Sequence, residues 1–121
     1  MDIKTYNAFC QSLPHTTHVI QWGGSHVWKV GGKVFAIAGE NSDGGFRCSF
    51  KVSELAFDIL KEQPGCQGAP HLASRGMKWI QRFSDEAVDD EALKDYVRES
   101  YRLVSLGLTK KLQKELGLNQ S

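Results

Sequence analysis

Long apolar runs are missing from this sequence of 121 residues, because no stretch stays hydrophobic over the roughly 18 residues that a membrane-spanning helix needs. The first residues, Met1-Asp2-Ile3-Lys4, also lack the basic region and the apolar run of a secretory signal. We therefore expect a cytoplasmic protein without a membrane partner.

Cysteine is scarce, and the sequence contains no closely spaced cysteine pair. Cys10, Cys48 and Cys66 are an odd number at wide spacing, which fits neither a disulfide framework nor the paired thiolates of a zinc site. We expect all three to be reduced thiols.

Neither sign of charge is in excess, since 15 Lys and Arg stand against 14 Asp and Glu and leave a formal net charge of +1. Dedicated nucleic-acid binders usually carry a plain basic excess, so an anionic partner would have to meet a local basic patch. The chain has no repeat, low-complexity tract or linker. Its length suits one domain over residues 1–121, which we expect to be a monomer.

The strongest local feature is a β-hairpin over residues 27–37, in which Gly31-Gly32 joins two strand-like runs. Both central positions of such a turn need positive φ, which glycine supplies. The turn predicts that Trp28 pairs with Phe35. Trp28, Phe35 and Ile37 would then share one face. The other face would carry Val27, Lys29, Val34, Ala36 and Ala38.

A third strand is predicted over residues 46–52, where apolar and polar residues alternate. If its apolar side faces the core, Phe50 lies opposite Phe35 and Cys48 lies opposite Ile37. The predicted buried row consists of Trp28, Phe35 and Phe50.

Helices are predicted before and after these strands. Asp2 is a plausible cap for a first helix that ends by Ser12, and Ser53 for a second that stops at Pro64-Gly65. Asp89 precedes the most regular helical stripe of the chain, and Thr109 precedes a short basic helix.

The segment 63–77, with two prolines and three glycines, is expected to be a long loop, and residues 78–83 form one more strand. This order of elements predicts an α+β fold, an antiparallel meander with helices packed on one face of the sheet.

Several motifs, in the right order, resemble the MmcQ/YjbR-like family. They are Gln21-Trp22-Gly23-Gly24 followed by residues 28–36, Ser49-Phe50-Lys51-Val52 before the second helix, Ala69-Pro70-His71-Leu72 leading to Lys78-Trp79, and Glu99-Ser100-Tyr101. The resemblance implies a CyaY/frataxin-like fold and a double-wing module, to which DNA binding is often ascribed.

Catalytic machinery is not evident. A nucleophile needs a neighbouring base and an orienting group, and Cys66 with His71 is the one candidate pair of nucleophile and base. A chance pairing is the simpler interpretation, so we expect no enzyme activity, no catalytic residue and no cofactor.

Two groups of residues could be taken for metal ligands. His15 and His18, with His26 or His71, lack carboxylate or thiolate partners at matching spacing, so we expect structural roles for them. The acidic residues are similar in kind to the ridge by which frataxin-like proteins bind iron, but a helix N-terminus also attracts carboxylates. That acidic cluster contains Asp85, Glu86, Asp89, Asp90 and Glu91.

The strand register brings together one basic patch. It gathers Lys29, Arg47 and Lys51 on the face opposite the core, with Lys33 at the hairpin tip and Val34 aligned with Lys51. We expect weak, largely sequence-independent nucleic-acid (DNA) binding through this patch and the hairpin wings. Trp22 and Trp79 could stack on bases if they are exposed. The alternatives are a protein or small-ligand adaptor that uses the same surface, and metal binding at the acidic cluster.

Overall fold

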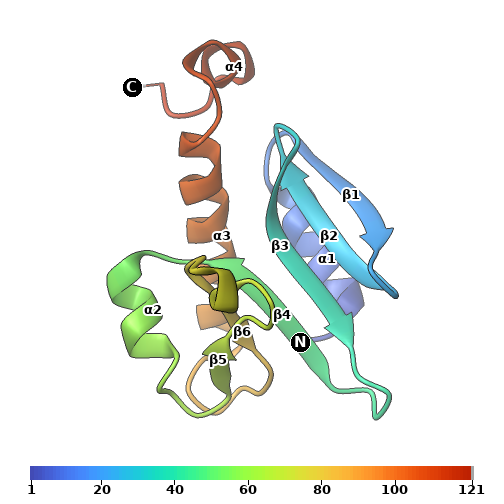
Figure 1. Cartoon of the computed structure of the whole chain (residues 1–121). Coiled ribbons are helices and arrows are strands. Elements are labelled where there is room, and N and C mark those ends of the chain that lie inside the picture. Colours follow the sequence, from blue (N-terminus) through green and yellow to red (C-terminus); the bar gives the residue numbers. More distant parts are fainter. Residues whose placement is uncertain (121) are drawn as a thin grey trace.

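The computed structural model describes residues 1–120, which form a six-stranded antiparallel sheet, four α-helices and one short 3-10 helix (Figure 1). The elements in chain order are α1 (Ile3–Ser12), β1 (Thr16–Gln21), β2 (Ser25–Val30), β3 (Lys33–Glu40), β4 (Phe46–Lys51), α2 (Glu54–Leu60), β5 (Cys66–Gly68), η1 (Ala73–Arg75), β6 (Trp79–Arg82), α3 (Asp90–Leu106) and α4 (Lys110–Leu116). The order of strands across the sheet is β1-β2-β3-β4-β6-β5.

Helices α1 and α3 pack on the same face of the sheet, behind the strands in Figure 1. One hydrophobic core joins them to the strands, with Tyr6 from α1 and Leu93 from α3 both fully buried. The expected α+β architecture with helices on one face is therefore confirmed. The side chains of Asp2, Ser53, Asp89 and Thr109 each accept a backbone hydrogen bond at the start of a helix, as the sequence predicted.

A β-bulge in β3 changes the predicted register of the hairpin. Gly31 and Gly32 have φ of 56° and 86°, so the two-residue turn forms as expected. It pairs Lys29 with Val34, but the register then shifts, and Trp28 pairs with Ala36 instead of Phe35. The bulge accommodates Phe35 as an extra residue, because two residues of β3 stand where a regular ladder has one.

The bulge moves every later residue of β3 to the face opposite the one predicted. Ile37 pairs with Ser49 and not with Cys48, while Cys48 lies opposite Ala38. The prediction that Ile37 shares a face with Trp28 was therefore wrong, as was the placement of Ala36 and Ala38 away from the core. Burial of Trp28, Phe35 and Phe50 is confirmed, since their exposed fractions are 5%, 0% and 0%.

Ser100 of α3 fills the gap that the bulge leaves in the ladder between β3 and β4. Its hydroxyl donates to the Phe35 carbonyl at 2.6 Å and accepts from the Lys51 amide at 2.8 Å. The ladder between β3 and β4 begins only at Ala36, which pairs with Phe50. The expected pairing of Phe50 with Phe35 and the expected alignment of Val34 with Lys51 are therefore not formed. Helix α3 is thereby hydrogen-bonded to the backbones of two neighbouring strands.

The segment 63–77 is more ordered than its composition predicted. It contains β5, which pairs with β6 as the outermost strand, and the 3-10 turn η1. The strand was missed because it has only three residues, too few to show a period.

None of the helices within residues 1–120 combines the length and the apolar composition needed to cross a bilayer.

Candidate binding cleft on the open face of the sheet

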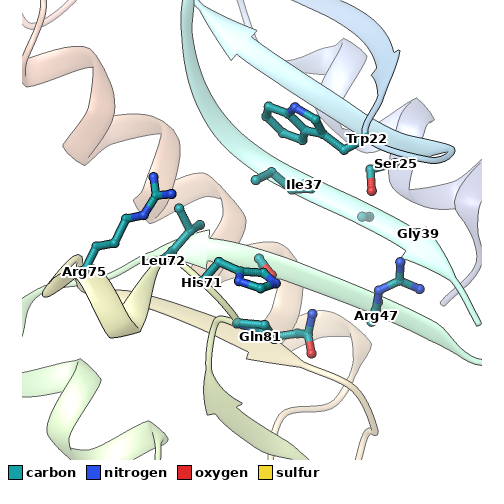
Figure 2. Close-up of a pocket in the computed structure, with 12 residues that line it drawn as sticks. Trp22, Ser25, Ile37, Gly39, Arg47, His71, Leu72, Arg75 and Gln81 are labelled. Atoms are coloured by element: carbon teal, nitrogen blue, oxygen red, sulfur yellow. The ribbon is translucent and has the colours of Figure 1, made fainter.

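A cleft of about 520 Å³ lies on the face of the sheet that α1 and α3 leave uncovered (Figure 2). Its volume falls within the range of about 300–1,000 Å³ that is usual for ligand sites. Its lining residues are Trp22, Ser25, Ile37, Ala38, Gly39, Arg47, Ser49, Pro70, His71, Leu72, Arg75 and Gln81.

The floor of the cleft is a row of residues across three strands. Ile37 of β3 pairs with Ser49 of β4, which in turn pairs with Gln81 of β6. Ile37 faces the cleft because of the bulge, which turns its side chain away from the core. Gln67 Nε2 donates to Gln81 Oε1 at 2.8 Å, so the amide nitrogen of Gln81 is the group left to face the cleft.

The two walls are formed by turns. Trp22 follows β1, has φ of 49°, and leaves 64% of its surface exposed. His71 has φ of 68°, and both residues thus occupy the left-handed region that side chains with a Cβ rarely adopt. Figure 2 shows Trp22 over the β3 side of the floor and His71 over the β4 side. Local backbone strain of this kind is often found at binding sites.

The charged side chains of the cleft are all basic. Of the twelve described residues that line it, two are arginines and none is an aspartate or glutamate. Arg47 lies against Gly39, where an added methyl group would come within 3.0 Å of its Nη2 atom, and its Nη1 donates to Asn41 at 3.0 Å. Arg75 lies at the opposite end of the cleft (Figure 2). An anion can therefore be met from both ends.

The structure gathers only part of the predicted basic patch. Arg47 lines the cleft, and the alternation of the strands puts Lys29 and Lys51 on the same face but outside the lining. Lys33 is engaged elsewhere, since its ammonium donates to the Gly107 carbonyl at 2.8 Å, just past the end of α3. The cleft therefore differs from the patch that the register predicted.

Four residues of the cleft were not grouped by the sequence reasoning. Trp22 was considered for stacking only together with Trp79, which is 5% exposed. No sequence pattern placed Trp22 near Arg75, Gln81 or His71. A signal did exist, because the segments 21–24 and 69–72 both carry the family resemblance and both contribute to the lining.

The pair Cys66 and His71 is not brought together. Cys66 belongs to the hydrophobic core, whereas His71 lines the cleft on the other face. Burial raises the pKa of the Cys10 thiol to about 12 and also raises the pKa values of Cys48 and Cys66. All three thiols are therefore protonated at neutral pH, which is the poorly nucleophilic form.

Two of the four histidines meet on the α1 side of the sheet. His18 Nε2 lies 2.9 Å from His26 Nδ1, and the Asn7 amide nitrogen lies 3.2 Å from the same atom. Asn7 is oriented by Trp28, whose indole donates to its Oδ1 at 2.9 Å. Among residues 1–120, no group of three or more His, Cys, Asp or Glu side chains is placed to hold a metal ion.

Two acidic residues at the start of α3 have structural partners. Asp89 accepts from the Ala92 amide and caps the helix. Asp90 accepts from the α-amino group of Met1 at 2.8 Å and from Arg82 at 2.9 Å, and these two hydrogen bonds, in that order, lower its pKa. Two of the five carboxylates of the acidic cluster thus serve the fold.

Comparison with known proteins identifies similar chains. The YjbR family model matches residues 11–103. The crystal structure of Deinococcus radiodurans protein DR2400, with a DUF419 domain, has a TM-score of 0.83 and 28% identity over 99% of this chain and 91% of that one. A Pseudomonas syringae protein has a TM-score of 0.67 and 18% identity over 85% of this chain and 98% of its own, which shows the shared fold alone. The search of curated proteins gave no match.

Proposed function

This chain belongs to the YjbR family, and we propose that it is a non-enzymatic module that binds nucleic acid through the open face of its sheet. The observation that carries the proposal is the exposed indole of Trp22, which stands over a cleft whose charged lining groups are guanidinium ions. Proteins that bind nucleic acid without sequence preference combine these two kinds of group.

Each component has a separate physical role. An aromatic face stacks on a base of any identity, which contributes about 1–3 kcal/mol per base. A guanidinium pairs with phosphate through two parallel hydrogen bonds, and Arg47 and Arg75 supply one such group at each end of the cleft. Phosphate contacts position the strand and carry no sequence information.

The charge balance limits the affinity. Lys29 and Lys51 extend the basic surface beyond the cleft, so that about four phosphate contacts are available when Arg47 and Arg75 are counted. Four contacts make affinity fall by about fiftyfold for single strands, or about 150-fold for duplexes, between 50 and 200 mM salt. The formal net charge of +1 adds little long-range attraction.

Charge reversal on the open face tests the proposal. The triple variant Lys29→Glu, Arg47→Glu, Lys51→Glu should lose DNA binding at low salt. It should keep its circular dichroism spectrum, because Lys51 is exposed, Lys29 and Arg47 are half-buried, and none of the three belongs to the hydrophobic core, where the large losses of stability arise. The matched control reverses Lys110, Lys111 and Lys114 on α4 and should bind as the parent does. Unchanged affinity of the first variant, or no binding by the parent at low salt, would contradict the proposal.

The size of the cleft favours one other candidate, an adaptor that binds a small anionic ligand or a protein through the same surface. Such an adaptor should not bind DNA with an affinity that falls steeply as the salt concentration rises. A DNA titration at about 50 and at about 200 mM salt therefore separates the two functions.

A further inference from the structure

We infer that the cleft receives one unpaired nucleotide from within a single strand, with its base stacked on Trp22 and its two flanking phosphates at Arg47 and Arg75. This inference rests on the proposed nucleic-acid binding and names the form of nucleic acid that the site takes. It also predicts a preference for bases that carry keto oxygens.

The exposed indole argues for an unpaired base. In a duplex the faces of the bases are stacked on one another, and a protein reaches only their edges in the grooves. A ring that projects from a turn with 64% of its surface exposed can stack only on a base whose face is free. The two walls also enclose the floor of the cleft between them, which suits an inserted base better than the convex side of a double helix.

The positions of the arginines argue for a nucleotide inside a strand. Arg47 projects from β4 at one end of the cleft and Arg75 from η1 at the other (Figure 2). A free mononucleotide carries phosphate on one side of its sugar only, whereas a nucleotide within a strand has a phosphate on each side. Two separated cations match the second arrangement.

The polar groups of the floor argue for particular bases. Gln81 presents its amide nitrogen, because its oxygen already accepts from Gln67. Because Arg47 and Arg75 are assigned to the flanking phosphates, this amide nitrogen is the donor of the floor that can meet the base. Thymine, uracil, guanine and cytosine each carry a keto oxygen as an acceptor, whereas adenine has none and presents an exocyclic amino donor beside its ring-nitrogen acceptors. We therefore expect oligothymidylate to bind more tightly than oligoadenylate.

The experiment compares fluorescently labelled oligothymidylate, oligoadenylate and a duplex of the same length by anisotropy at low salt. We expect the order oligothymidylate, then oligoadenylate, then duplex. Tryptophan emission gives a second reading, because Trp22 is exposed while Trp28 and Trp79 are each 5% exposed, so that stacking should quench the solvent-accessible component. Trp22→Ala should weaken single-strand binding by about 5- to 150-fold, the loss of one stacked base, and Trp22→Phe should restore most of it.

Variants locate the effect. Arg75→Ala should weaken the binding of oligothymidylate, whereas Lys111→Ala on α4 should not. Ile20→Ala removes another exposed apolar side chain from the hairpin of β1 and β2, whose turn carries Trp22, and should leave binding unchanged. Circular dichroism of each variant shows whether it is folded.

The outcomes separate the inference from the proposed function. If duplex and single strands bind equally and Trp22→Ala has no effect, the inference is overturned while nucleic-acid binding stands. Equal binding of thymidine monophosphate and a phosphate-flanked thymidylate would overturn the requirement for two phosphates. If none of the nucleic acids binds, both the inference and the proposed function fail.

Discussion

Removing the hydroxyl of Ser100 should destabilise the protein far more than the loss of one oxygen atom suggests. Ser100 is fully buried, donates to the Phe35 carbonyl and accepts from the Lys51 amide. In Ser100→Ala both backbone groups lose this partner inside the protein, and each unsatisfied buried group costs about 1–3 kcal/mol. The expected loss in the free energy of unfolding is therefore about 2–6 kcal/mol, a large part of the stability of a small domain.

Urea denaturation followed by tryptophan fluorescence measures this loss, provided that the slope against denaturant stays the same in parent and variant. Ser105→Ala is the matched control, because Ser105 is also buried on α3 but donates to the Arg102 carbonyl one turn earlier in the same helix. Its hydroxyl also accepts from the amide of Asn119, an exposed residue whose amide has a second acceptor in Gln113. We expect the control to cost less than about 1 kcal/mol. A Ser100→Ala variant as stable as the Ser105→Ala control would refute the role assigned to the Ser100 hydroxyl.

Three further predictions concern other parts of the fold. Phe35→Ala should lower the free energy of unfolding by about 3–5 kcal/mol, as measured by thermal or urea unfolding, because Phe35 is fully buried and its ring meets Tyr101 edge-on. A loss below about 1 kcal/mol would show that Phe35 is not packed at the bulge as described. Asp90→Asn should cost about 1–3 kcal/mol, because it removes the carboxylate from the guanidinium of Arg82, which is 3% exposed; Glu91→Gln is the exposed control. Burial and then the neighbouring His26 lower the pKa of His18, so its contribution to stability is present above about pH 6.5 and is lost as the pH falls through the folded pKa. Amide exchange in β1 should accordingly accelerate in mild acid, and a rate independent of pH after correction for intrinsic exchange would contradict this.

Much of the fold could be predicted because its signals are local. The Gly31-Gly32 turn and the side chains that cap the helices each depend on a few consecutive residues. The register beyond the turn could not be predicted in the same way. The bulge at Phe35 has no glycine to mark it, and it is stabilised by Ser100, which is 65 positions away in the sequence. Alternation alone therefore assigned Ile37 to the wrong face.

The candidate site was less accessible to prediction, because it depends on segments that are distant in the sequence. Strand alternation predicted an open face with basic residues on it, and Arg47 lies on that face as predicted. The two walls could not be predicted, since a positive φ is uncommon for residues other than glycine and no local sequence pattern indicates one at Trp22 or His71. Arg75 belongs to the segment 63–77, which was expected to be a loop, and Gln81 reaches the cleft because β6 pairs with β4, a pairing that no sequence pattern specified.

The hydroxyl bridge of Ser100 also has a consequence for the time course of folding. The sheet reaches β6 by residue 82, but the Lys51 amide and the Phe35 carbonyl gain their partner only when the middle of α3 docks. During synthesis the strands therefore leave the ribosome well before the residue that closes the gap between them. Because closing such long loops is slow, we expect nascent chains that end before residue 100 to remain sensitive to protease, and chains that include all of α3 to become resistant in one cooperative step.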